Sequence, residues 1–229
     1  MEASYKDHVT FGRVDFRAEK VAIVCNGPSL ARSASFISAL RSAGVHVVAV
    51  NQVLAHISGA DTWFTLDPCK RNAWIPRHPV PGVRYVMAVP DDYGSPRAAC
   101  KDHRIEMIPG TTYIRRMAGH MFGTLRARPG LSDDPGGVHT GNSGYGALGL
   151  AWLMGARTIA LLGIDGGLGG YAFGCGEPRS LRHLPELFSS AVPQLMARGI
   201  RVANASPQSK IACFERIAPE ALPIWFERS

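Results

Sequence analysis

Two short segments of small and polar residues have the composition of anion-binding loops: Asn-Gly-Pro-Ser at 26–29 and Thr-Gly-Asn-Ser-Gly at 140–144. Each precedes residues at helical spacing, so each is expected to begin a helix. The free backbone N–H groups and the positive dipole end at a helix start bind phosphate groups. The pair therefore predicts a nucleotide held from two sides, whereas either segment alone is equally explained by ordinary helix capping.

Further polar residues stand where apolar runs end. Asn51, Asp67 and Asp165 each follow a short apolar run with the features of a buried strand. In a parallel sheet ligands bind beyond the carboxyl ends of the strands, so these residues are expected to gather at one site. The predicted nucleotide-binding residues are Asn26, Gly27, Pro28, Ser29, Asn51, Asp67, Asn142, Ser143, Gly144 and Asp165.

Two side chains that follow Asp165 along the chain could take part in catalysis. The hydroxyl of Tyr171 can donate to a phosphate, and His183 can act as a base near neutral pH. A single histidine among eight is more often structural or exposed, so its type alone gives His183 little weight. Neither a Walker loop nor a Gly-x-Gly-x-x-Gly pattern occurs at 26–29, which argues against P-loop kinases and ordinary dinucleotide oxidoreductases.

The elements that would position these residues alternate between strand and helix. Strands separated by crossover helices predict an α/β fold with a Rossmann-like, mostly parallel sheet and helices on both faces. The predicted helix 142–156 contains three glycines, which cost about 2–3 kcal/mol of helix propensity. Close packing against the sheet or a ligand must offset this cost. The predicted strands are 21–25, 45–50, 62–66, 83–89, 158–162 and 200–203, and the predicted helices are 30–43, 142–156 and 184–198.

Residues 90–138 have little periodicity, with five prolines and many glycines. They predict an irregular lid or insertion within one nucleotide-binding α/β domain that spans residues 1–229. Within them, segment 97–128 holds seven basic residues against two acidic ones, which accounts for +5 of the net charge of +7. Such a segment suits phosphate, nucleic acid or an acidic acceptor, and a solvated basic loop is the alternative.

Composition limits the class of protein. The chain has 229 residues, of which 46% are hydrophobic and 19% charged, so it can form one domain with a buried core. No apolar run approaches the roughly 20 residues of a membrane span, and residues 1–20 carry too many charges for a secretory signal. The five cysteines are scattered and form no Cys-x-x-Cys pair, so a cytoplasmic protein is expected, as a monomer or a homo-oligomer.

The order of the motifs resembles the bacterial lipooligosaccharide sialyltransferases, which use CMP-activated sialic acid. The same skeleton also resembles a broader group that includes archaeal-type 6-hydroxymethylpterin pyrophosphokinases and phage-borne proteins, through segments 27–30, 67–68 and 143–165. The pieces that match the sialyltransferases are Asn26-Gly27-Pro28-Ser29-Leu30, Asn51-Gln52, Ser143-Gly144, Gly163-Ile164-Asp165 and Tyr171-Ala172-Phe173.

The sialyltransferase resemblance implies a role for each matched position. Tyr171 would stabilise the departing phosphate, and His183 would deprotonate the acceptor hydroxyl. The chain departs from the family where Gly166 replaces a tyrosine and where Asp67 replaces an asparagine. The residues that would hold the nucleotide are Asn26, Gly27, Ser29, Asn51, Ser143 and Gly144.

Three functions are open from the sequence. The leading one is an inverting, metal-independent glycosyltransferase, without a cofactor, that moves a sugar from a CMP-type nucleotide donor to a hydroxyl acceptor. The first alternative is a pyrophosphokinase for a pterin-like or nucleoside substrate, in which Mg²⁺ would bind Asp67 and Asp165. The second is a non-catalytic protein that binds a nucleotide or nucleic acid, with segment 97–128 on the phosphates.

Overall fold

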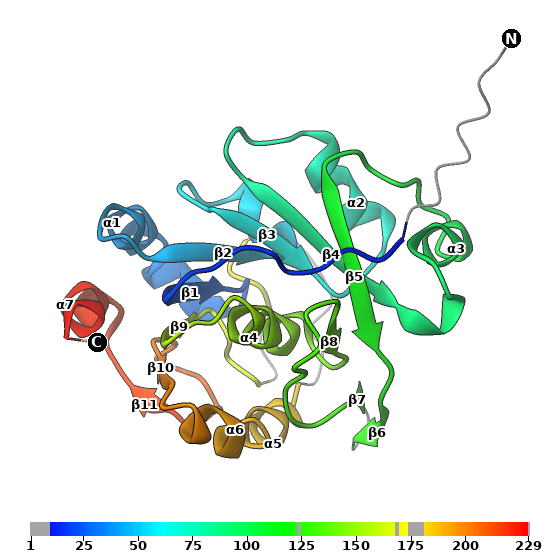
Figure 1. The fold of residues 1–229 in the computed structure, drawn as a ribbon. Helices are drawn as coiled ribbons and strands as arrows, with labels where there is room; N and C mark the ends of the chain where they lie inside the picture. Colours follow the sequence, from blue (N-terminus) through cyan, green and yellow to red (C-terminus); the bar gives the residue numbers. More distant parts are fainter. Residues whose placement is uncertain (1–9, 123–124, 168–169, 174–180, 229) are drawn as a thin grey trace, which may run out of the picture.

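The computed structural model describes residues 10–122, 125–167, 170–173 and 181–228. Its strands are β1 (Lys20–Val24), β2 (His46–Val50), β3 (Thr62–Thr65), β4 (Arg84–Pro90), β5 (Thr111–Met117), β6 (His120–Phe122), β7 (Leu125–Ala127), β8 (Gly137–His139), β9 (Thr158–Leu162), β10 (Arg201–Asn204) and β11 (Glu215–Arg216). Within these ranges nine strands form one sheet, in the order β11-β10-β9-β1-β2-β3-β4-β5-β8 (Figure 1). Every neighbouring pair in it is parallel, whereas β6 and β7 form a separate antiparallel hairpin.

Helices lie on both faces of this sheet. They are α1 (Ile37–Ser42), α2 (Lys70–Arg77), α3 (Pro96–Asp102), α4 (Ser143–Leu153), α5 (Leu184–Ser189), α6 (Val192–Ala197) and α7 (Leu222–Glu227), with 3-10 turns that include η1 (Pro28–Arg32) and η3 (Asn51–Ala55). α4, α5 and α6 pack into one hydrophobic cluster, and α1, α2, α3 and α7 pack into another. The predicted α/β fold with a mostly parallel sheet is therefore confirmed. None of the helices in the described ranges is long and apolar enough to cross a lipid bilayer.

Glycines let α4 pack closely on the sheet. All eleven residues of this helix are buried. A Cβ at Gly146 would lie 2.8 Å from the side chain of Leu66, and a Cβ at Gly144 would lie 3.1 Å from the sulfur of Cys25. Leu66 and Cys25 directly follow β3 and β1, so close packing against the sheet offsets the propensity cost of these glycines.

Segment 90–138 differs from the sequence expectation. It contains α3 and β5, and residues 111–116 of β5 pair with residues 85–90 of β4. Only Tyr113 and Ile114 of β5 are buried, and the next two residues are arginines that bond elsewhere, so the apolar signal of a strand is weak. Between β5 and β8, the described residues 118–122 and 125–136, which include β6 and β7, lie outside the nine-stranded sheet.

Two of the predicted helices are divided. Residues 30–43 form η1, a second 3-10 turn and α1. The buried Ser33 hydroxyl donates to the carbonyls of Ser29 and Leu30 at 3.4 Å, which competes with regular helix bonding there. Residues 184–198 form α5 and α6, because Pro193 in the first turn of α6 has no N–H to continue the α5 ladder.

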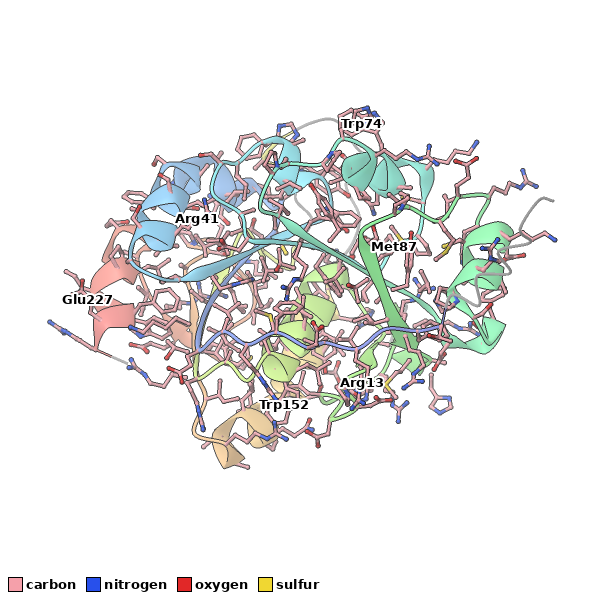
Figure 2. All side chains as sticks on the ribbon, turned by 45° about the horizontal axis from the view of Figure 1, so that its top comes forward. Arg13, Arg41, Trp74, Met87, Trp152 and Glu227 are labelled. Carbon is pink, nitrogen blue, oxygen red and sulfur yellow. The ribbon has the colours of Figure 1, made fainter. Side chains whose placement is uncertain are left out.

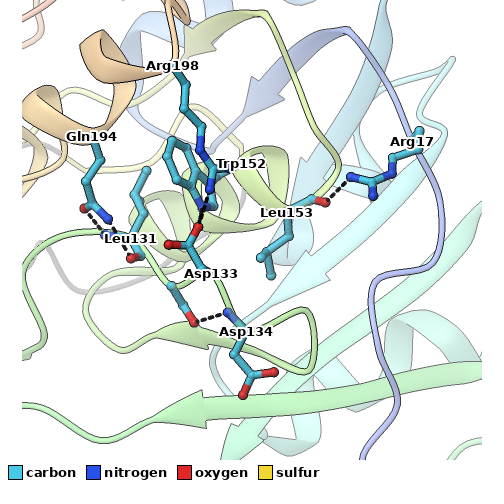
Figure 3. A network of polar contacts seen from close by, with 9 residues as sticks. Arg17, Leu131, Asp133, Asp134, Trp152, Leu153, Gln194 and Arg198 are labelled. Carbon is cyan, nitrogen blue, oxygen red and sulfur yellow. Dashed lines mark hydrogen bonds and ion pairs between the residues drawn. The ribbon is translucent and has the colours of Figure 1, made fainter.

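The chain that follows β7 is fixed to α4 and α6 (Figure 3). The side-chain amide of Gln194 exchanges two hydrogen bonds with the backbone of Leu131, at 2.6 and 2.9 Å. Asp133 accepts from the Trp152 indole at 3.1 Å and pairs with Arg198, whose guanidinium lies 3.6 Å from the centre of the Trp152 ring. This part of the predicted lid is therefore bound to the body of the protein.

Candidate active site

The direction in which strands are added to the sheet reverses beside β1. From β1 the chain adds β2, β3, β4, β5 and β8 on one side, and α4 then returns it to β9 on the other side, where β10 and β11 follow. In open parallel sheets ligands bind beyond the carboxyl ends of the strands at such a reversal. The loops after β1 and β9 lie there, and they contain the predicted residues 26–29 and Asp165.

The loop after β1 is bound to the loop after β9. The Gly27 N–H donates to the carbonyl of Gly163 at 2.8 Å, and the Ser29 N–H donates to Oδ2 of Asp165 at 3.0 Å. A Cβ at Gly27 would lie 2.3 Å from that carboxylate oxygen, so only glycine fits. The anion at the start of η1 is thus the Asp165 carboxylate, and a phosphate placed there would meet a negative charge.

Two polar atoms in this contact have unused bonding capacity. Ser29 Oγ and Asp165 Oδ1 are buried and have no hydrogen-bond partner within the described part of the chain. Buried polar atoms in native proteins are nearly always bonded to protein, water or a ligand. A donor and an acceptor are therefore available together at the point where strand order reverses.

Asn26 fixes the loop that carries Tyr171. Its side-chain amide donates to the carbonyl of Phe173 at 2.8 Å and accepts from the Phe173 N–H at 3.0 Å. Its backbone carbonyl accepts from the Ala172 N–H at 3.0 Å, and the Phe173 ring stacks on His56 after η3, with centroids 5.0 Å apart. Both polar atoms of the Asn26 side chain hold this loop, and Tyr171 remains exposed.

The ends of β2 and β3 are joined through Asn72, which the sequence analysis did not select. Asn51 has a φ of +57°, a left-handed conformation that is uncommon outside glycine. Its side-chain oxygen accepts from the Thr65 hydroxyl at 2.7 Å and from the Asn72 amide at 3.5 Å. The buried Asn72 amide also donates to Thr65 Oγ1 and to the carbonyl of Asp67, both at 3.0 Å. It therefore fixes Asn51 relative to Asp67.

The start of α4 lies against the end of β3. Asn142 caps the helix and accepts from the Gly144 N–H at 2.7 Å. The Ser143 hydroxyl donates to Oδ2 of Asp67 at 2.9 Å and accepts from the Leu66 N–H at 3.4 Å. Ser143 is buried whereas Asp67 is exposed, so the carboxylate is the accessible member of this pair.

The starts of η1 and α4 meet the same short segment after β9. A Cβ at Gly144 would lie 3.3 Å from the side chain of Ile164, and the flanking Gly163 and Asp165 bond the loop after β1. Cys25 lies between the two helix starts, where burial first and the Asp165 carboxylate second raise the pKa of its thiol. The thiol is therefore uncharged at neutral pH and packs as an apolar group.

His183 directly precedes α5, beside the loop after β9. The Leu181 N–H donates to the carbonyl of Gly167 at 3.4 Å, and a Cβ at Gly166 would lie 3.7 Å from Leu184. The His183 side chain is half-buried, and residues 174–180, between it and Tyr171, lie outside the described ranges.

Gly166 also explains one departure from the sialyltransferase motif. Its φ of +66° is a conformation that strains any residue with a side chain. The backbone after Asp165 is therefore one in which the tyrosine of that family would be unfavourable.

Arg116, at the end of β5, is a further candidate for this site. Its guanidinium donates to the carbonyl of Leu66 at 2.7 Å. Burial lowers the pKa of Arg116, and the carboxylates of Asp67, Asp92 and Asp91 act in the opposite direction. The sequence showed Arg116 only as one of the seven bases of segment 97–128, which the structure distributes over α3, β5, β7 and the intervening loops.

The two carboxylates of the magnesium alternative are engaged by different elements. Asp67 accepts from Ser143 at the start of α4, and Asp165 accepts from Ser29 in η1. Among the residues that the structure describes, no group of three or more His, Cys, Asp or Glu side chains could hold a metal ion.

Solved structures share this arrangement of strands and helices. MAf glycosyltransferase from Magnetospirillum magneticum AMB-1 has a TM-score of 0.59 and 13% identity, over 96% of this chain and 38% of that one. The sialyltransferase CstII from Campylobacter jejuni, in complex with the substrate analogue CMP-3FNeuAc, has a TM-score of 0.50 and 15% identity, over 88% of this chain and 87% of that one. The chain therefore shares the fold of these two proteins.

The likeness to CstII recurs in its complex with cytidine-5′-monophosphate, with a TM-score of 0.52 and 16% identity over 89% of this chain and 86% of that one. At these identities the similarity concerns the fold alone. The chain spans 38% of the length of the Magnetospirillum protein. No protein-family model matches the chain, and no curated protein sequence matches it either.

Proposed function

We propose that the protein is a glycosyltransferase that moves a sugar from a CMP-type nucleotide donor to a hydroxyl acceptor. The observation that carries this proposal is the reversal of strand order beside β1, where the predicted polar residues lie on neighbouring loops. It is supported by the shared fold of CstII, which was solved in complex with CMP and with a CMP-sugar analogue.

The donor nucleotide would lie between the starts of η1 and α4. Its phosphate is better placed at the start of α4, beside Asn142 and Ser143, because the Asp165 carboxylate already takes up a backbone N–H of η1. The Asp67 carboxylate at the start of α4 bonds the Ser143 hydroxyl instead, and the Arg116 guanidinium offsets its charge. A hydroxyl of the nucleotide could bond both Ser29 Oγ and Asp165 Oδ1, the two buried atoms without a partner in the described ranges.

The transfer would be a single displacement. The acceptor oxygen attacks the anomeric carbon as the bond from that carbon to the CMP phosphate oxygen breaks, which inverts the configuration. His183 would take the proton of the acceptor hydroxyl, and Tyr171 would donate a hydrogen bond to the departing phosphate. The exposure of Tyr171 on a loop that Asn26 holds in place is consistent with this role.

Calorimetric titration with CMP, and with ATP plus Mg²⁺, tests the proposal. We expect CMP to bind and the affinity to fall at least tenfold in Ser143→Ala, whereas Ser42→Ala, on the exposed surface of α1, leaves it unchanged. His183→Ala is expected to retain CMP binding and to lose transfer. Binding of ATP with Mg²⁺ but not of CMP would instead support the pyrophosphokinase alternative.

A further inference from the structure

One side of α2 exposes an aromatic ring between basic residues. Lys70, Trp74, Arg77 and His78 are all exposed, and their spacing places them on one side of the helix. Figure 2 shows Trp74 at the periphery of the molecule, on α2. Segment 69–78 contains three Lys or Arg residues and no acidic residue. We call this exposed side of Lys70, Trp74, Arg77 and His78 the α2 face.

Trp74 differs from the other tryptophans of the chain. Trp74 is 52% exposed, whereas the exposed fraction of Trp63, Trp152 and Trp225 is at most 7%. The Trp74 ring stacks on His78, with centroids 4.0 Å apart and an angle of 28° between the planes. The His78 ring is fixed in turn, because its Nδ1 lies 2.9 Å from the Trp74 carbonyl. The result is an exposed aromatic pair with a fixed mutual geometry.

The α2 face begins at the candidate active site. Asp67, which accepts from Ser143, is exposed three residues before the helix starts. The opposite side of α2 carries Asn72, which bonds Asn51 and the carbonyl of Asp67. With a rise of 1.5 Å per residue, Trp74 lies about 6 Å beyond Lys70 along the axis. A chain molecule that entered the site at Asp67 could therefore continue along this face.

We propose that the α2 face binds an acidic saccharide, namely the acceptor of the transfer, an inference that rests on the proposed function. The apolar C–H face of a sugar ring would pack on the Trp74 ring, because this contact removes apolar surface of both rings from water while the sugar hydroxyls stay hydrated. Carboxylate groups on the saccharide would meet Lys70 and Arg77. Arg77 now lies 3.1 Å from Glu106, but both side chains are largely exposed, and such a pair exchanges readily for another anion.

A saccharide fits the α2 face better than a lipid bilayer does. Helices that lie in a membrane interface present a broad apolar side, with Trp, Phe and Leu together. The apolar residues Ala73 and Ile75 of α2 are instead buried in the protein core, and Trp74 is the one large apolar side chain that the helix exposes. The charged residues Lys70 and Arg77 lie about one helical turn before and after Trp74.

Trp74 itself provides the measurement, because it is the one tryptophan that a quencher in solution can reach. We expect hexagalacturonate, which carries one carboxylate per ring, to reduce acrylamide quenching of the fluorescence at least twofold, and uncharged maltohexaose to have a much smaller effect. By calorimetry, Lys70→Ala and Trp74→Ala should each weaken hexagalacturonate binding at least fivefold. Arg157→Ala, before β9, and Met196→Ala, on α6, remove an exposed charge and an exposed apolar side chain elsewhere and should leave it unchanged.

Other outcomes would overturn the inference. Protection of Trp74 by vesicles of anionic lipid or by single-stranded DNA, without protection by hexagalacturonate, would assign the α2 face to a different partner. No protection by any of these probes would leave it without a ligand role. CMP binding, measured in the same Lys70→Ala and Trp74→Ala proteins, is expected to be unchanged. If CMP fails to bind the native protein while hexagalacturonate protects Trp74, the proposed donor is wrong and the saccharide surface stands.

Discussion

Asn26 and Asp165 each use their side chain to hold the backbone of a distant segment of the candidate site. The side chain of Asn26 holds the backbone of Phe173, and the Asp165 carboxylate holds the backbone of Ser29. From the sequence both residues could be placed at the ends of strands, because an apolar run followed by a polar residue is a local pattern. Their partners are more than a hundred residues away, and no local pattern reveals them. The partners of Asn72 are nearer, 21 residues away at Asn51 and 5 at Asp67, but the bonds to them depend on how the ends of two strands meet in the sheet.

Gly27→Ala should destabilise the protein by about 2–4 kcal/mol, because the new Cβ has no space. It would lie 2.3 Å from the Asp165 carboxylate and 2.5 Å from the Gly163 carbonyl, and neither group can move without breaking the contact between β1 and β9 loops. Urea denaturation measures the change. Gly167→Ala is the matched control, since its nearest neighbour would lie 4.0 Å away. Equal stabilities of the two variants would contradict the packing described here.

Asn26→Ala should loosen the loop that carries Tyr171. It removes two hydrogen bonds to Phe173, and the loss of about 1–3 kcal/mol from a part-buried contact increases local opening by roughly 5-fold to 150-fold. Amide hydrogen exchange at Phe173 is the measurement. The Ala172 N–H provides an internal comparison, because it bonds the backbone carbonyl of residue 26, which the substitution keeps. Unchanged exchange at Phe173 would show that other contacts hold the loop.

At the scale of elements, the strands that were predicted are those buried on both faces. β1, β2, β3, β4, β9 and β10 each contain adjoining apolar residues that are buried, and the structure places each strand within one or two residues of its predicted bounds. β5 was missed because Arg115 and Arg116 interrupt its apolar run; one pairs with Asp134 and the other bonds a backbone carbonyl. A local sequence pattern shows that these side chains are charged, but it does not show the distant partners that stabilise them within a strand.

The glycines of α4 should respond differently to the same substitution. Gly146→Ala gains helix propensity but places a Cβ 2.8 Å from Leu66, so we expect a net loss of about 1–2 kcal/mol from overpacking. Gly149→Ala meets Val138 at 3.4 Å, an ordinary contact, and should stabilise the protein by about 0.5–1 kcal/mol. Thermal and urea denaturation of both variants give the comparison. A stabilising Gly146→Ala would mean that α4 can shift away from β3.

For the molecule as a whole, the sequence predicted the parallel sheet, but not the segments that pack around it. The residues before β1 form hydrogen bonds with distant parts of the fold: the Gly12 N–H donates to the Tyr113 carbonyl, and the Ala18 N–H donates to the Met154 carbonyl. From the sequence, the charged composition of this segment indicated only that it is not a secretory signal. The α2 face was also missed, because exposure of Trp74 depends on which side of a short helix the core covers. Such features are properties of the assembled sheet and its layers.

Two histidines at strand ends, His46 at the start of β2 and His139 at the end of β8, make the stability of the whole molecule sensitive to acid. Burial lowers the pKa of His46, with Asp61 opposing the shift and Arg84 adding to it, and burial likewise lowers the pKa of His139. The unfolded chain therefore binds more protons than the native state as the pH falls below the ordinary histidine pKa of about 6.5. The stability that these groups contribute is complete above that pH and is lost as the pH falls through their lower native pKa values.

We therefore expect the free energy of unfolding to decrease from pH 7.5 to pH 5.5, measured by urea denaturation at each pH. The double variant His46→Gln and His139→Asn should show a smaller decrease, because an amide keeps a polar contact to Thr62 and to the Gly130 carbonyl without a group that titrates. His120→Gln, on the exposed hairpin, should leave the slope unchanged. If the double variant retained the full slope, groups other than these two histidines would carry the acid sensitivity. Asp134 would not be among them, because the Gly136 N–H lowers its pKa and the carboxylate stays ionised at pH 5.5.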